Sequence, residues 1–188
     1  MANIGLRKPY IAKYNRASKS YSDGFRYSHA VNVNIDPQYA EASLYGDDVQ
    51  VEYEKDFTSA QVSLGTTSTP IKAADVMFGH EVDYEEKKVV YKSTDEANYV
   101  GVGVTGVEKV DGESVYVALI VLCAKFADSA DAYNTKGEQL QFNTPSITGK
   151  AIAADDDGNW KERKLFTKAE DADAYVRNFL NIEDEPSI

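Results

Sequence analysis

Two scarcities limit what this chain of 188 residues can be. Its only cysteine, Cys123, excludes an internal disulfide framework and a zinc cluster built on thiolates. Its longest apolar run, residues 115–123, covers nine positions, whereas a transmembrane helix needs about 20. No apolar stretch follows Arg7 and Lys8, so the N-terminus does not resemble a cleaved secretory signal. We therefore expect synthesis and assembly in a reducing cytoplasm, with no membrane partner.

Histidine is also scarce, and neither His29 nor His80 has the spacing that metal-binding motifs use. Residues 101–106 match the glycine spacing of a dinucleotide-binding loop, but that loop lies between a strand and a helix. Here the glycines alternate with valines inside a predicted strand, and a second strand follows. We therefore expect Gly101 and Gly103 to thin one face of that strand where another chain segment comes close.

Acidic motifs are equally poor candidates for chemistry. Residues 155–159, DDDGN, resemble part of a calcium loop, yet Lys164 would occupy the position of the bidentate carboxylate. A hairpin turn is the better interpretation, because Asp, Asn and Gly all favour turns. Acidic pairs such as Asp47 and Asp48 are interpreted as solvated surface. The sequence thus predicts no catalytic residue, no cofactor site and no metal site.

The formal net charge of −11 is unevenly distributed, since residues 1–28 carry six basic side chains against one acidic one. Such a segment could bind nucleic acid, a membrane or the acidic body of a neighbouring copy, or stay solvated without a partner. We divide the chain into a basic N-terminal arm that includes the first strand (1–28), a single β domain (29–181) and an acidic tail (182–188).

Alternation with a period of two dominates the sequence and predicts a mainly β fold. Val31, Val33 and Ile35 alternate with Asn32 and Asn34, and we expect Asp-Pro at 36–37 to end that strand. A second alternating segment, residues 49–54, predicts a half-buried strand whose outer face is polar and acidic. That outer face consists of Gln50, Glu52 and Glu54.

A long hairpin is predicted from residues 99–110 and 114–125, because the Asp-Gly pair between them tolerates the positive φ of a tight turn. Its second strand is apolar on both faces, as expected for a central strand of a sandwich. Leu140 and Phe142 indicate a further strand. Two more segments, 147–153 and 160–166, flank the DDDGN turn.

Two helices interrupt the β pattern. Residues 70–78 are predicted to form a short helix, which begins at a proline and ends before Gly79. Residues 167–180 form the second, in which Thr167 and Glu170 match a capping box. Its apolar stripe at helical spacing is expected to pack on the sheet. The stripe consists of Ala172, Val176, Phe179 and Leu180. The predicted architecture is a β-sandwich or barrel with these two helices.

Several short segments together carry a family resemblance. They are residues 1–12 (MANIGLRKPYIA), 42–48 (ASLYGDD), 78–80 (FGH), 99–103 (YVGVG), 134–138 (NTKGE) and 142–149 (FNTPSITG). In this order they are similar to the major tail (tail-tube) proteins of long-tailed bacteriophages, in particular a group common in phages of Gram-positive hosts. The matching segments span most of residues 1–166. Gly46 stands where that family usually has an alanine-like residue.

The resemblance implies a structural virion protein. Such proteins form rings, commonly of six copies, which stack into a hollow tube. Strands of each copy join an inner barrel, and a long loop and the terminal arms bridge successive rings. The tube houses a tape-measure protein and conducts DNA at ejection. It ends at tail-terminator and tail-tip proteins, so the expected partners are other copies and these tail proteins.

The polar strand faces fit an inner barrel, which needs one water-facing side. We hypothesise that the lumen is lined by Asn32, Asn34, Gln50, Glu52 and Glu54. Cations on phosphate would add salt-sensitive affinity and stall DNA, so we expect an acidic lumen through which DNA passes as non-specific cargo. The basic segment would then dock between successive rings. Its candidate contact residues are Arg7, Lys8, Lys13, Arg16 and Lys19.

Three alternatives remain open at this point. The chain could be another virion β-protein, such as a tail terminator, a tail-tip protein or a capsid-decorating protein. It could be a carbohydrate-binding β-sandwich module, for which Tyr10, Tyr14, Tyr21 and Tyr27 offer the only clustered aromatics. It could be an enzyme whose residues meet only in space. We favour the structural protein and expect no enzymatic activity.

Overall fold

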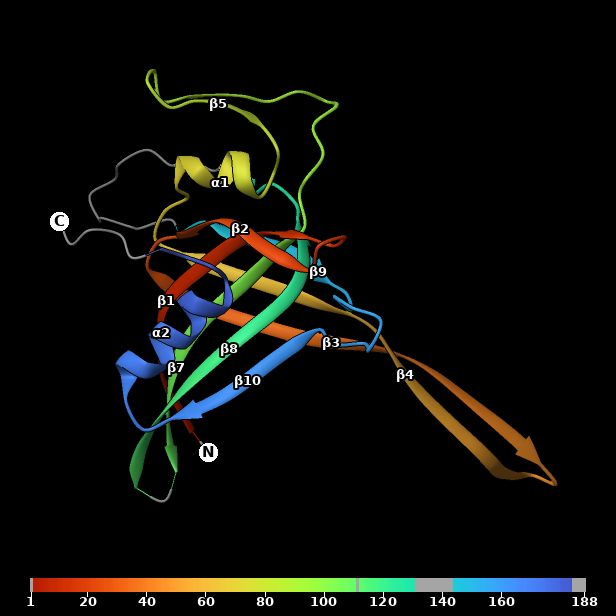
Figure 1. The fold of residues 1–188 in the computed structure, drawn as a ribbon. Coiled ribbons are helices and arrows are strands. Elements are labelled where there is room, and N and C mark those ends of the chain that lie inside the picture. Colours follow the sequence, from red (N-terminus) through yellow and green to blue (C-terminus); the bar gives the residue numbers. More distant parts are fainter. Residues whose placement is uncertain (1, 111, 131–143, 184–188) are drawn as a thin grey trace, which may run out of the picture.

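A computed structural model describes residues 2–110, 112–130 and 144–183. Within those ranges the chain forms ten strands and two helices (Figure 1). They are β1 (Ala2–Asn15), β2 (Ser20–Arg26), β3 (Ala30–Gly46), β4 (Val49–Thr66), α1 (Ile71–Val76), β5 (Glu81–Asp83), β6 (Lys88–Val90), β7 (Val100–Val110), β8 (Glu113–Phe126), β9 (Ser146–Ala151), β10 (Lys161–Phe166) and α2 (Ala169–Phe179). The expected mainly β fold with a short helix and a C-terminal helix is confirmed.

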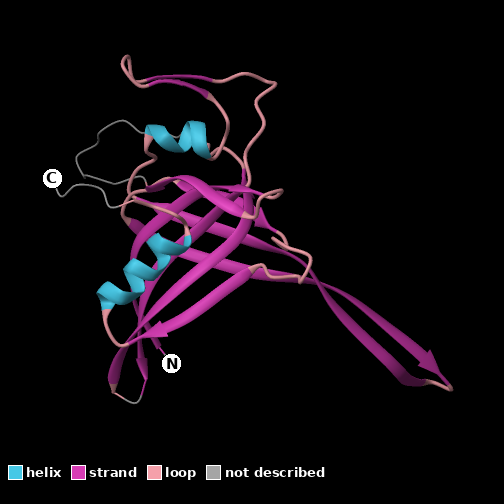
Figure 2. Ribbon diagram, viewed as in Figure 1, coloured by secondary structure: helices cyan, strands magenta, loops and turns pink. Residues whose placement is uncertain are grey.

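One large antiparallel sheet, in the order β2-β1-β7-β8-β9-β4-β3, curves around the main core. β10 pairs with β8 outside this order, and β5 and β6 form a separate pair. Ile11 on β1, Val102 on β7 and Leu64 on β4 belong to the same buried cluster, although they come from distant parts of the sheet. The helix α1 adds Val76 to this cluster, so it closes one end of the curved sheet (Figure 2).

The helix α2 covers the opposite face of the same central strands. Val176 and Leu180 are fully buried there. A Cβ atom on Gly103 would lie 2.3 Å from the Val176 side chain, and one on Gly101 would lie 2.4 Å from Tyr21. The expectation that these glycines thin the strand for a close neighbour is therefore confirmed. β8 has apolar residues on both faces because core clusters lie on both sides of it.

The predicted capping box of α2 is wrong. The N-cap is Lys168, which makes no side-chain capping hydrogen bond. β10 extends to Phe166, so Thr167 and Lys168 are needed to turn the chain before the helix begins. Glu170 and Asp171 instead lie in the first turn, where carboxylates interact favourably with the helix dipole.

The predicted end of the strand at residues 36–37 is also wrong. β3 continues through Pro37, which lies opposite Ala60, as far as Gly46. Proline is tolerated here because β3 is the last strand of the sheet, and no ladder on its far side requires a backbone N–H.

The basic N-terminal segment forms β1 and β2, and β1 lies between β2 and β7 inside the main sheet. The turn at residues 155–158 joins β9 to β10, but these strands both pair with β8 and do not form a hairpin with each other. Leu140 and Phe142, and the acidic tail beyond Glu183, lie outside the described residues.

Candidate assembly surfaces

The hairpin of β3 and β4 extends far from the body of the molecule (Figure 1). We define its outer part, residues 39–56, as the β3–β4 arm. The segment at 49–54 is not half-buried as predicted but exposed on both faces, because it lies on this arm. The exposed large apolar side chains on the arm are Tyr39 (45%), Leu44 (59%), Tyr45 (67%), Val49 (65%), Val51 (66%) and Tyr53 (50%). Contiguous apolar exposure of this kind marks an interaction surface.

Two register shifts determine which side chains share a face of the arm. The first leaves Thr58 without an opposite residue, because Gln38 pairs with Ser59 and Tyr39 pairs with Phe57. As a result, Glu54 and Asp56 share a face with Ser59 across the shift. Cross-strand pairing then defines an acidic face, on which Glu52, Glu54 and Asp56 lie opposite Leu44, Ala42 and Ala40.

The second shift leaves Val51 unpaired and moves Gln50 to the other face. The Gln50 amide donates a hydrogen bond of 3.3 Å to the Ser43 hydroxyl, which lies on that other face. Lys55 forms a 2.7 Å ion pair with Glu41 on this face as well. The prediction that Gln50 shares a face with Glu52 and Glu54 is therefore wrong.

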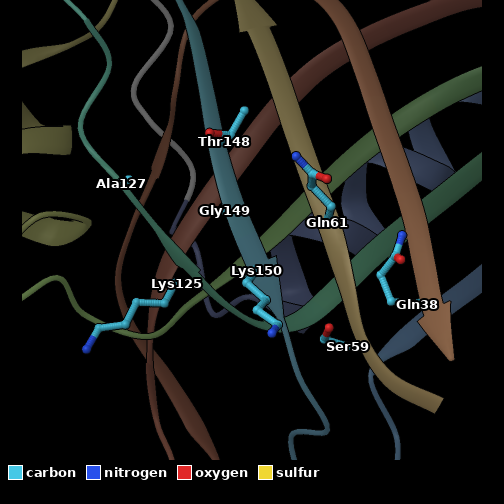
Figure 3. Close-up of a pocket in the computed structure, with 8 residues that line it drawn as sticks. All are labelled: Gln38, Ser59, Gln61, Lys125, Ala127, Thr148, Gly149 and Lys150. Atoms are coloured by element: carbon cyan, nitrogen blue, oxygen red, sulfur yellow. The ribbon is translucent and has the colours of Figure 1, made fainter. Parts of the chain in front are cut away.

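A polar face covers the body where β3, β4 and β9 run side by side. Directly opposite residues across the three strands are Asn34, Ser63 and Thr148 in one row and Asp36, Gln61 and Lys150 in the next. Gln38, Ser59, Gln61 and Lys150 line an open hollow of about 530 Å³ on this face (Figure 3). Asn32 lies on the same face over Gly65. Of the five lumen candidates, Asn32 and Asn34 thus lie on the body, and the other three lie on the arm.

The five basic candidates are not brought together. Lys8 forms a 2.9 Å ion pair with Asp173 of α2, and Lys19 lies 3.4 Å from Asp156. Arg7 is exposed near Lys8. Lys13 and Arg16 lie at the other end of β1 and line a hollow with Tyr99 and Lys125. No sequence pattern groups Lys125 with them, because the two segments meet only through the sheet topology.

A buried histidine links the segment around α1 to the end of β8. His80 Nδ1 lies 2.7 Å from Asp95, and its Nε2 lies 3.0 Å from Asp128. An imidazole can donate to both carboxylates only when it is protonated. Burial opposes this charge, but the hydrogen bonds to Asp95 and Asp128 and the charges of these carboxylates together raise the pKa of His80 above its ordinary value.

This cluster predicts a pH-dependent contribution to stability. The pKa of His80 is raised in the folded protein. The stabilisation of the fold by protonated His80 is therefore complete below about pH 6.5, and it is lost as the pH rises through the folded pKa. His80→Gln should therefore lower the free energy of unfolding more at pH 5.5 than at pH 9, measured by denaturant titration. His29→Gln, at the other histidine, is the control. An equal loss for His80→Gln at both pH values would contradict the assignment.

No group of three or more His, Cys, Asp or Glu side chains among the described residues is arranged to hold a metal ion. Over the same ranges, no helix has the length and apolarity needed to cross a membrane.

No family model matches the sequence, and no curated protein matches it significantly. Among solved structures, the chain is similar to the tube-terminating cap of the anti-feeding prophage, determined by cryo-electron microscopy. The two share 8% sequence identity at a TM-score of 0.43, over 88% of this chain and 93% of that chain. A likeness of this degree is too distant to carry a functional conclusion.

Proposed function

We propose that this chain is a structural subunit of a phage tail tube, which assembles with copies of itself into stacked rings. The observation that carries the proposal is the β3–β4 arm, whose tyrosines, valines and leucine are exposed on both faces. A two-stranded hairpin alone is at best marginally stable in water. A neighbouring molecule that covers these side chains would stabilise the arm, and we assign that role to a second copy of the chain.

The edges of the main sheet support the same proposal. In the described part of the chain, β2 pairs only with β1, and β3 pairs only with β4, so one edge of each strand is open. Open edges are templates for pairing with another chain. Copies arranged in a ring can join such edges into a continuous inner barrel, and six copies per ring is the number we propose.

The polar face of the body is the surface that we assign to the lumen. Asn32 and Asn34 lie there beside Ser63, Gln61 and Thr148, whose hydroxyl and amide groups are well hydrated and uncharged. Neutral groups add none of the salt-sensitive affinity for phosphate that would slow DNA. The same face also carries one acidic and one basic side chain in a single row, Asp36 and Lys150. The surface that we assign to the lumen is therefore polar with mixed charge, and not acidic as expected from the sequence. DNA would pass as non-specific cargo, and the tube would house a tape-measure protein and end at terminator and tip proteins. The subunit would be made and assembled in the host cytoplasm and reside in the virion tail.

Electron microscopy of the purified protein tests this proposal. At high concentration the protein is expected to form long hollow tubes in negative stain, because arm and edge contacts leave no natural stop to stacking. Single closed rings that do not stack would instead favour a terminator. A protein that stays monomeric at every concentration would contradict the proposed function.

A further inference from the structure

Four cations lie close together on one side of this acidic protein. Lys13 and Arg16 come from the end of β1, Lys125 from β8 and Lys150 from β9. Lys125 and Lys150 are direct cross-strand partners, an arrangement in which like charges repel. No described carboxylate lies within ion-pair distance of any of the four. Glu96 lines the same hollow as Lys13, Arg16 and Lys125 but forms no ion pair with them, so cations outnumber carboxylates there.

Three of the four cations, Lys13, Arg16 and Lys125, line a hollow beside Tyr99. Arg16 Cζ and Lys125 Nζ each lie 5.3 Å from the centroid of the Tyr99 ring, so their charges are separated by no more than twice that distance. Lys13 lines the same hollow, which has a volume of about 510 Å³. We call this site the cationic pocket. Its aromatic floor and its cations suit an anionic partner with some apolar surface.

The acidic face of the β3–β4 arm has the complementary properties. Glu52, Glu54 and Asp56 follow one another on one face, so they span roughly 13 Å. None of them forms an ion pair with a described side chain, whereas Lys55 on the other face is paired with Glu41. Asp56 and Glu54 lie opposite Ala40 and Ala42, whose short side chains leave these two carboxylates accessible to a partner.

We propose that the acidic face of one copy's arm docks into the cationic pocket of a second copy. The proposal rests on the proposed function, since it names the contact that the arm makes during assembly. The arm cannot reach the pocket of its own copy, because β3 and β4 stay paired from Ala30 and Thr66 to Gly46 and Val49 and carry it away from the body (Figure 1). Phosphate of nucleic acid is the less suited occupant, since a net charge of −11 repels it at long range.

Charge reversal on each side of the contact tests this docking. The arm variant carries Glu52→Lys and Glu54→Lys, and the pocket variant carries Arg16→Glu and Lys125→Glu. Each variant alone is expected to raise the concentration needed for assembly by about tenfold or more, because like charges meet at the interface. An equimolar mixture of the two variants should restore assembly, since each then meets the opposite charge. Sedimentation velocity and electron microscopy give the assembled fraction.

The matched control for the arm variant is Glu85→Lys with Glu86→Lys, which makes the same change of net charge at exposed positions between β5 and β6. It should assemble like the wild type, and all variants should keep the wild-type thermal unfolding. Assembly of both reversed variants at the wild-type concentration would overturn the docking and leave the tail-tube proposal standing. A wild type that never assembles would overturn the tail-tube proposal itself. Binding of a DNA oligonucleotide that the pocket variant loses, with assembly unchanged, would reassign the pocket to nucleic acid.

Discussion

Replacing Leu44, Val49 and Val51 with threonine is expected to abolish tube formation while the body stays folded. The three side chains are 59–66% exposed at the outer end of the arm, so the isolated subunit gains little from them. Full burial of one such side chain at an interface stabilises it by about 1.5–3 kcal/mol. Even a partial loss of this burial energy at three positions should lower the association constant at least about a hundredfold. Threonine is β-branched, as the two replaced valines are, and therefore suits a strand at all three positions.

The measurement is the concentration dependence of assembly by light scattering and negative-stain microscopy. The free energy of unfolding should stay within about 0.5 kcal/mol of wild type, as for other surface substitutions. Leu165→Thr is the matched control, because Leu165 is 50% exposed on β10 in the body. If the triple variant formed tubes at the wild-type concentration, the arm would not be the assembly surface.

Gly103→Val is expected to destabilise the body by about 3 kcal/mol or more. A Cβ at Gly103 would meet Val176 at 2.3 Å and Leu180 at 3.0 Å, so α2 would have to move off the sheet. Overpacking of this kind costs about 1–3 kcal/mol, and displacement of the helix exposes further apolar surface. Because both side chains belong to the core cluster beneath α2, denaturant unfolding followed by circular dichroism measures the effect directly.

Two further variants separate this clash from a general effect of losing glycine. Gly5→Ala should leave stability almost unchanged, since its nearest neighbour would be Val107 at 3.7 Å. Gly103→Ala combined with Val176→Ala should be less destabilised than the sum of the two single changes, because the second substitution makes room for the first. Wild-type stability of Gly103→Val would show that α2 does not pack against β7 as described.

Local chemistry in the sequence was enough to predict the class of fold and most of its elements. The period-two alternation indicated β3, β4, β7 and β8, whereas β2, β5 and β6 were not predicted. The Asp-Gly pair correctly predicted the hairpin of β7 and β8, with Gly112 at a φ of +88°. The short helix lies between a proline and a glycine as expected, and Gly79 has the positive φ of an exit position. These features depend on a few neighbouring residues, which is why the sequence contains them.

The assembly surfaces depend on contacts between distant residues. A strand can have the same alternation of apolar and polar residues whether one of its faces is buried or both are exposed. The sequence could therefore not show that residues 49–54 lie on a projecting arm. A one-residue shift reverses the face of every later side chain, so only the pairing of β3 with β4 could separate Gln50 from Glu52.

By itself, then, the sequence determined a mainly β chain with two helices and a tight turn between β7 and β8. It also determined that the glycines of β7 leave room for a closely packed neighbour. Only the tertiary structure decided where charge and apolar surface gather. Arg16 and Lys125 are far apart in sequence and share Tyr99 because β1, β7 and β8 are neighbours in the sheet. His80, which follows α1, meets Asp128, which follows β8, across 48 positions. The physical reason is that backbone geometry is set locally, whereas surfaces are set by which strands pair.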